Sequence, residues 1–256
     1  MTLEIRNSSL EPALILLYDP EEKYSPKALE RARYAPRVLV GGSKGVDASD
    51  VEEMVDLLTK RYKVPHEKIM LFPGHEKQVT PKVSGIFLPA CIPNSTNPDN
   101  LGPRQERAMP LLKKLYGNRI ELVWYLPHGG SAFEAAECKK VTPSEEIELF
   151  EKWTDSDKFH WFYQEAGSGQ EMLPLPLIKK CKRICEKKGR NFIYGGGIRR
   201  FEQAKNLLKA GINYIVMSNV QLEPWGYRVV KKIQTQLYTA RNIYFAYLLS
   251  RRQFLV

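Results

Sequence analysis

Eight short apolar runs, bounded by turn-forming residues, recur along this chain of 256 residues. They span residues 13–18, 37–40, 68–72, 85–89, 121–126, 159–163, 192–194 and 214–217. Most are continuous rather than alternating, as is typical of parallel strands that are covered on both faces. Helical patterns separate them, at 26–34, 48–62, 103–115, 143–153, 175–188, 200–210 and after Pro224. This order predicts an α/β protein, and eight such units fit a TIM (β/α)8 barrel formed by a single domain, 1–256.

One connection leaves little room for a helix. Residues 73–84, between the third and fourth apolar runs, read Pro-Gly-His-Glu-Lys-Gln-Val-Thr-Pro-Lys-Val-Ser. A right-handed crossover with its helix needs at least about 10–12 residues. Because two prolines and a glycine also lower the helical potential of this one, the sequence predicts a modified barrel that lacks its third helix.

Two glycine-rich segments, 163–169 and 194–199, follow predicted strands and precede helical patterns. Glycines let backbone N–H groups close on an anion, and the next helix adds its positive N-terminal end. Because 214–219 ends another apolar run in the same way, the segments predict the phosphate site of a barrel. Glu165, set among the glycines, is either a base beside that phosphate or a carboxylate that pairs with a cation such as Arg199.

Polar residues also follow the first two apolar runs. Asp19 precedes a proline, and Gly-Gly-Ser-Lys-Gly occupies 41–45. A carboxylate and a hydroxyl, completed by water and substrate oxygens, suit Mg²⁺ on a diphosphate. The alternatives are an aspartate that forms a turn and a glycine turn without a ligand. The four histidines show no metal-ligand spacing.

The net charge of +10 is compatible with nucleic acid, an anionic membrane surface or phosphorylated substrates. Lysine and arginine are scattered rather than gathered in a nucleic-acid motif, so we expect no nucleic-acid partner. The apolar run 243–249 is far shorter than the roughly 20 residues of a membrane span. The start of the chain lacks a signal-peptide pattern, and the four cysteines form no CxxC motif. We expect a cytoplasmic protein with reduced thiols.

Together the motifs resemble those of the geranylgeranylglyceryl phosphate synthase family, which includes the bacterial heptaprenylglyceryl phosphate synthases. In chain order they are Asp19-Pro20, Gly41-Gly-Ser43, Leu71-Phe-Pro-Gly74, Asn94-Ser95 with Asn97-Pro98, Tyr163-Gln-Glu-Ala-Gly-Ser-Gly169, Gly195-Gly-Gly-Ile-Arg199 and Ala210-Gly211. They extend over about residues 14–220, nearly the whole chain. The family fold is a modified barrel without its third helix, as the crossover 73–84 predicts independently.

The resemblance implies a prenyltransferase that joins sn-glycerol 1-phosphate to a long prenyl diphosphate, most directly geranylgeranyl diphosphate, in the first ether link of archaeal membrane lipids. The implied metal is Mg²⁺, held by Asp19 and Ser43. The implied catalytic residues are Glu165, as the base, and Tyr163. The implied contacts to glycerol phosphate are Tyr163, Gln164, Glu165, Ala166, Gly167, Ser168, Gly169, Gly196, Gly197, Ser218 and Asn219. Phe72, Trp124 and Tyr125 are the aromatic candidates for the prenyl tail.

Four positions depart from the family pattern. His75 is unusual after Pro-Gly, Lys23 comes one residue later than usual after Asp19, Gln164 replaces a common leucine, and Ser218 replaces a glycine. The last two leave room for another phosphorylated acceptor, such as phosphoglycerate. A third alternative is a non-catalytic basic protein that binds nucleic acid.

The C-terminal segment, about 237–256, is more apolar than closing a barrel requires. Packing against a second subunit in a homo-oligomer is the favoured interpretation. The alternative is peripheral contact with the membrane in which a prenyl substrate partitions.

Overall fold

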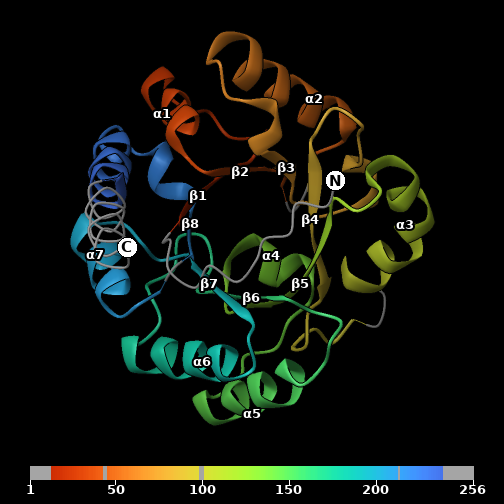
Figure 1. The fold of residues 1–256 in the computed structure, drawn as a ribbon, viewed down its shortest axis with the longest axis vertical. Helices are drawn as coiled ribbons and strands as arrows, with labels where there is room; N and C mark the ends of the chain where they lie inside the picture. The colour runs from red at the N-terminus through yellow and green to blue at the C-terminus, as the bar shows by residue number, and fades with distance from the viewer. Residues whose placement is uncertain (1–12, 43–44, 98–100, 213, 239–256) are drawn as a thin grey trace, which may run out of the picture.

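The computed structural model describes residues 13–42, 45–97, 101–212 and 214–238. Eight parallel strands form a closed barrel in chain order, and the last strand pairs with the first. They are β1 (Ala13–Tyr18), β2 (Arg37–Val40), β3 (Ile69–Leu71), β4 (Gly85–Cys91), β5 (Ile120–Pro127), β6 (Trp161–Glu165), β7 (Asn191–Gly195) and β8 (Tyr214–Met217). The predicted barrel is therefore confirmed, and Figure 1 shows it with helices around the central strands.

The helices that surround the strands are α1 (Pro26–Arg31), α2 (Ala48–Asp56), α3 (Leu101–Tyr116), α5 (Pro143–Thr154), α6 (Leu175–Lys187) and α7 (Phe201–Lys209). Residues 226–238 are also helical, whereas α4 (Gly130–Ala135) is a short helix in the loop after β5. The start of α5 illustrates the local signals: Thr142 and Glu145 form a capping box and Pro143 occupies the first turn. Within the described residues, no helix is long and apolar enough to cross a membrane.

The crossover between β3 and β4, all of which is described, contains only one short 3₁₀ turn, η4 (Glu76–Gln78). The predicted loss of the third helix is thus confirmed. Neighbouring elements cover the gap, since the Tyr116 hydroxyl donates to the Thr80 carbonyl at 2.5 Å. The Thr80 hydroxyl in turn donates to Glu52 of α2 at 2.6 Å. Side-chain hydrogen bonds to α2 and to α3, the helix that follows β4, therefore cover the place of the missing helix.

Strand residues alternate between the barrel interior and the helical layer. On β6, Tyr163 packs with the interior cluster and Phe162 with the outer one. On β5, Tyr125 faces inward, whereas Trp124 packs against Phe150 of α5 with ring centroids 4.7 Å apart. The expectation that Trp124 lines the barrel mouth is wrong, because the period-2 alternation puts neighbouring residues on opposite faces.

Candidate active site

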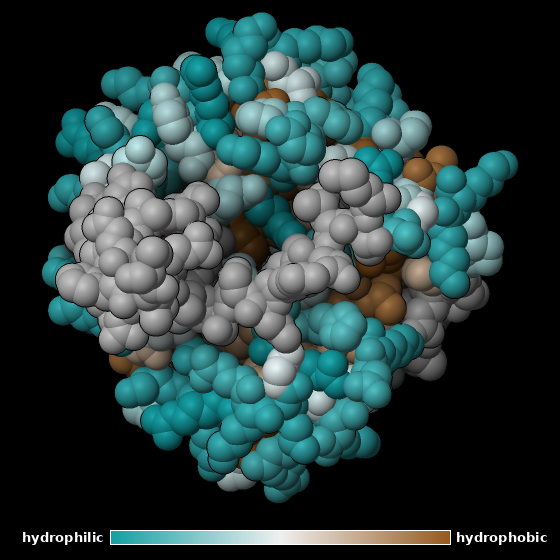
Figure 2. Space-filling model, in the orientation of Figure 1, coloured by the Kyte–Doolittle hydropathy of each residue, from teal (hydrophilic) through white to brown (hydrophobic). Residues whose placement is uncertain are grey.

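The carboxyl ends of the strands surround two adjoining cavities, and Figure 2 shows this end of the barrel hollowed near its centre. We call them the β1–β5 cavity and the β6–β8 cavity after the strands whose ends supply most of their walls. Both walls include Leu17, Glu165, Ser168, Ser218 and Asn219. This is the end at which barrel enzymes carry their active sites.

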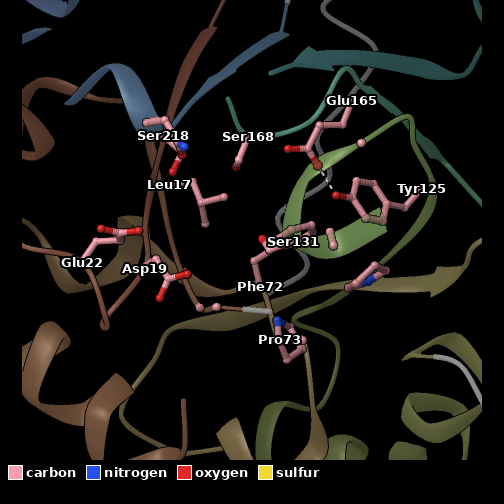
Figure 3. A pocket seen from close by; sticks show the side chains of 17 residues that line it. Leu17, Asp19, Glu22, Phe72, Pro73, Tyr125, Ser131, Glu165, Ser168 and Ser218 are labelled. Atoms are coloured by element: carbon pink, nitrogen blue, oxygen red, sulfur yellow. Dashed lines mark hydrogen bonds between the residues drawn. The ribbon is translucent and has the colours of Figure 1, made fainter. Parts of the chain in front are cut away.

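Glu165 is the last residue of β6 and lies where the two cavities meet. The hydroxyl of Tyr125, on the neighbouring strand, donates a hydrogen bond to its carboxylate (Figure 3). Desolvation by the surrounding barrel wall raises the pKa of Glu165 to about 7, although Tyr125 and His128 act in the opposite direction. A carboxyl group that exchanges its proton near neutral pH is suited to general-base catalysis.

Arg199, the cation considered as an alternative partner for Glu165, makes a different contact. Its guanidinium donates to the carbonyl oxygen of Gly169 at 2.5 Å. Within the described part of the chain, no ion pair reaches the Glu165 carboxylate. The geometry therefore favours the base interpretation over the ion pair.

Glycines bring the two glycine-rich segments together. Gly196 and Gly197 have φ angles of 74° and 68°, a region that favours glycine. A Cβ atom on Gly196 would lie 2.5 Å from the amide nitrogen of Gly167, so the two backbones pack directly on each other. Gly195 serves another purpose, because a Cβ there would lie 2.4 Å from the Tyr163 hydroxyl. That glycine makes room for a side chain of the cavity wall.

Most of the expected glycerol phosphate contacts lie together. The residues that line the β6–β8 cavity include Tyr163, Glu165, Gly167, Ser168, Gly169, Gly196, Gly197, Ser218 and Asn219. Gln164 and Ala166 do not line it. The Gln164 side chain points outward and donates to Glu146 of α5 at 2.5 Å, while Ala166 packs in the outer cluster. The expected contacts of these two side chains with glycerol phosphate are therefore not supported by the geometry.

Ser218 stands where the family pattern has a glycine, and its φ angle of −123° lies outside the left-handed region that favours glycine. Its hydroxyl forms a hydrogen bond with Tyr24, which also accepts one from the backbone N–H of Asp19 at 2.8 Å. The serine side chain is thus accommodated between the two cavities rather than forced into one of them.

Asp19 lies in the β1–β5 cavity with Glu22, on the side opposite Glu165 and Tyr125 (Figure 3). Burial raises the pKa of Asp19 to about 6, with smaller contributions from the Glu21 and Glu22 carboxylates. Gly42 packs against it so closely that a Cβ would lie 2.6 Å from the Asp19 Oδ1 atom. Ser43, the other expected metal ligand, lies outside the described residues.

Gln78 is a functional candidate that the sequence did not reveal. Its side chain is 1% exposed, its Nε2 donates to the Gly42 carbonyl at 2.7 Å, and its Oε1 accepts from the Gly74 amide at 3.0 Å. The helix-less crossover thereby supports the turn that packs against Asp19. A glutamine in a polar, proline-containing stretch gives no sequence signal of burial.

A family model described as the PcrB family matches residues 7–236. This chain belongs to the PcrB family. It is 32% identical to the geranylgeranylglyceryl phosphate synthase of Ignicoccus hospitalis over 219 residues, which cover 81% of this chain and 87% of that protein. The synthase of Zunongwangia profunda is 31% identical over 218 residues, which cover 80% and 88% of the two chains.

Solved structures agree with the fold of this PcrB protein. The (S)-3-O-geranylgeranylglyceryl phosphate synthase of Thermoplasma acidophilum, solved in complex with sn-glycerol-1-phosphate, superposes with a TM-score of 0.73. The two chains are 21% identical, and the match covers 89% of this chain and 93% of the other. The family resemblance read from the motifs is therefore confirmed.

Proposed function

We propose that this PcrB protein is a prenyltransferase that forms an ether bond between sn-glycerol 1-phosphate and a long-chain prenyl diphosphate, with geranylgeranyl diphosphate as the first candidate. The observation that carries the proposal is the position of Glu165, whose carboxylate borders both cavities. Such a group can act on two substrates that meet from opposite sides. The names of the curated relatives support the same reaction.

The β6–β8 cavity suits glycerol phosphate. Gly167, Gly169, Gly196 and Gly197 place backbone rather than side chains along its wall, which leaves N–H groups free to approach a phosphate. Ser168 and Asn219 add polar side chains. The C3 hydroxyl of a bound glycerol phosphate would then lie on the Glu165 side of this cavity.

The β1–β5 cavity suits the prenyl diphosphate. Its wall combines Asp19 with apolar side chains, among them Leu17, Phe72 and Ala132. We assign the diphosphate to the side of Asp19 and the first isoprene units to the apolar wall. Phe72 and Tyr125 both line this cavity, with ring centroids 5.8 Å apart, which supports an apolar occupant.

The reaction follows from this arrangement. The C3 oxygen of glycerol phosphate attacks C1 of the prenyl chain as the bond between C1 and the diphosphate oxygen breaks, and the diphosphate leaves with that electron pair. Glu165 takes the hydroxyl proton. Tyr125 orients the carboxylate through its hydrogen bond. Holding both reactants against one wall supplies proximity and orientation.

Mg²⁺ is part of this proposal, with Asp19 and Ser43 as its protein ligands. Within the described residues, no group of three or more His, Cys, Asp or Glu side chains could hold a metal. Asp19, half-buried against Gly42, fits a site whose remaining ligands are water and diphosphate oxygens. When bound, Mg²⁺ would neutralise the charge that develops on the leaving diphosphate.

The test is diphosphate release from geranylgeranyl diphosphate, with the lipid product identified by mass spectrometry. We expect Mg²⁺-dependent release with sn-glycerol 1-phosphate and much less with sn-glycerol 3-phosphate or phosphoglycerate. Faster turnover with phosphoglycerate would support the alternative acceptor instead. Absence of turnover, together with salt-sensitive retention on DNA, would support a basic binding protein.

The homo-oligomer and the membrane contact stay predictions. Apart from its first two residues, the segment 237–256 on which they rest lies outside the described residues. Light scattering after size exclusion tests the oligomer, and sedimentation with anionic vesicles tests the membrane contact. Removal of residues 239–256 should abolish whichever of the two is real.

A further inference from the structure

Glu146, in the first turns of α5, is a buried carboxylate that the proposed reaction does not use. Its side chain is 1% exposed. Its Oε1 atom contacts Nε2 of Gln164 at 2.5 Å and Nε2 of His128 at 3.1 Å. Gln164 Nε2 donates to this oxygen, and His128 Nε2 donates to it in the tautomer that carries the ring proton on Nε2. The other oxygen, Oε2, is buried with no hydrogen-bond partner among the described residues.

A buried carboxylate such as Glu146 costs free energy of folding at a site that apolar side chains could fill. A buried carboxylate with one bare oxygen is less stable than apolar side chains of similar volume. Leucine in place of Gln164 would be such a side chain. Packing alone therefore gives no reason for the pair that Glu146 and Gln164 form.

Both side chains that contact Glu146 belong to residues linked directly to Glu165, one by a peptide bond and one by a backbone hydrogen bond. Gln164 immediately precedes Glu165 on β6, and its side chain points to α5 while that of Glu165 points to the cavities. His128 immediately follows β5, and its backbone N–H donates to the carbonyl of Glu165 at 2.8 Å. Glu146 thus links the ends of β5 and β6 from outside the barrel.

The ends of β5 and β6 also carry Tyr125 and Glu165, whose side chains face the barrel interior and form a hydrogen bond with each other. Pro127 is paired in register with Glu165, and Tyr125 with Tyr163. A small shift of one strand end would therefore change the hydrogen bond between Tyr125 and Glu165. Displacements of about 1 Å in an active site can lower a rate by about 100-fold.

We propose that Glu146 is a positioning residue, which holds His128 and Gln164 so that the Tyr125 hydroxyl and the Glu165 carboxylate stay aligned. The role rests on the proposed function, in which Glu165 is the base. It also assigns a purpose to Gln164, which supplies a donor to the buried carboxylate instead of a contact to substrate.

The test compares wild-type protein with Glu146→Gln, Glu146→Leu and Gln164→Leu. Glu146→Gln keeps an oxygen that can accept hydrogen bonds from Gln164 and His128. Glu146→Leu loses both of these hydrogen bonds, and Gln164→Leu loses only the one from Gln164. The measurements are kcat, the KM for each substrate, the pH dependence of kcat and Tm. Glu148→Gln, an exposed substitution on the same helix, is the matched control.

We expect Glu146→Gln to keep kcat within about threefold of wild type, and Glu146→Leu to lower it by about 10-fold or more, with smaller changes in KM. Gln164→Leu should lower kcat in the same way. The pH midpoint of kcat should rise in both leucine variants, since a weaker bond from Tyr125 leaves the Glu165 carboxylate less stabilised. The other titratable groups that face Glu165 are His128, Tyr163 and Tyr194, and none is changed.

Wild-type kcat and pH midpoint in folded leucine variants would overturn the positioning role. If Glu146→Leu does not fold, Gln164→Leu decides, because it removes a single donor and leaves the Glu146 carboxylate in place. Loss of activity in the glutamine variant, with unchanged activity in Gln164→Leu, would also overturn the role. An inactive wild-type protein overturns the proposed function, and this role with it.

Discussion

The hydroxyl group of Tyr125 donates a hydrogen bond to the carboxylate of Glu165 across the pair of strands β5 and β6. Burial raises the pKa of Tyr125 well above its usual value, and the neighbouring Glu165 adds to that effect. The phenol therefore stays protonated and remains a donor at every pH at which the enzyme would work. The carboxylate, in contrast, gains or loses its proton near pH 7. This pair can hold a base in one orientation through its whole titration.

Tyr125→Phe should move the pH profile of kcat to higher pH. The hydrogen bond from Tyr125 lowers the pKa of Glu165, so its loss raises that pKa above about 7. We expect less activity at pH 7 and recovery toward pH 9, measured as diphosphate release. The exposed Tyr34→Phe is the control. If kcat rises with pH at the same midpoint in Tyr125→Phe as in wild type, Tyr125 does not lower the pKa of Glu165.

Glu165→Gln should lower kcat by about 10²–10⁴-fold, the usual contribution of a general base. Full activity in this variant would exclude the base role.

The same variant should be more stable than wild type at alkaline pH. Because the folded state raises the pKa of Glu165 from 4.5 to about 7, the wild-type protein loses stability as pH rises through this window. The loss of stability reaches about 3 kcal/mol above pH 7, since the shift from 4.5 to about 7 is about 2.5 pKa units at 1.36 kcal/mol each. The difference in Tm between variant and wild type should therefore be larger at pH 8 than at pH 4.5. A constant difference would contradict the raised pKa.

Gly195→Ala should destabilise the protein by about 1–3 kcal/mol, the typical cost of overpacking. The added Cβ would lie 2.4 Å from the Tyr163 hydroxyl and 3.0 Å from its ring. Removal of that hydroxyl in a Gly195→Ala/Tyr163→Phe double variant should recover part of the loss, and urea unfolding of the four proteins gives the coupling. Additive effects would show that the hydroxyl is not what the glycine accommodates.

Gln78→Met should raise the Mg²⁺ concentration needed for half-maximal activity by about 10-fold, while the KM for glycerol phosphate stays unchanged. Loss of two hydrogen bonds, each worth about 1 kcal/mol, frees the turn at Gly42 that packs against Asp19. Lys77→Met, at an exposed neighbouring residue, is the control. An equal change in the Mg²⁺ requirement and in the KM for glycerol phosphate would indicate general destabilisation instead.

The barrel could be predicted because its signals are local. Continuous apolar runs identified each strand, and the prolines and glycine of the crossover 73–84 identified the missing helix. Bounds were less certain: β6 begins at Trp161 rather than at Phe159, whose ring packs on Trp153 of α5 before the strand starts. An apolar residue in a turn looks like the first residue of a strand.

The partners within the site were harder to predict, because they depend on strand register and on which face a residue takes. Tyr125 and Trp124 are equally aromatic, yet only the first faces the cavity. Glu146 lies in the first turns of a helix, where acidic residues normally face water, but it is buried. Only the pairing of β5 with β6 and the packing of α5 bring Tyr125, Glu165 and Glu146 into one network.

The helix-less crossover has a consequence for how the barrel opens. Elsewhere a helix covers the connection between neighbouring strands, but here the cover depends on a few side-chain contacts. They are two hydrogen bonds of Gln78, those of Thr80 and Tyr116, and the ion pairs of Lys82 with α2. Sectors with few such bonds open locally at a lower free energy than global unfolding, and their amide hydrogens exchange early. Because Gln78 also supports Gly42, each opening removes the wall beside Asp19. The sector that opens first is therefore the one to which the proposed function assigns the diphosphate. We expect bound diphosphate to slow amide exchange in this sector more than anywhere else in the described part of the chain.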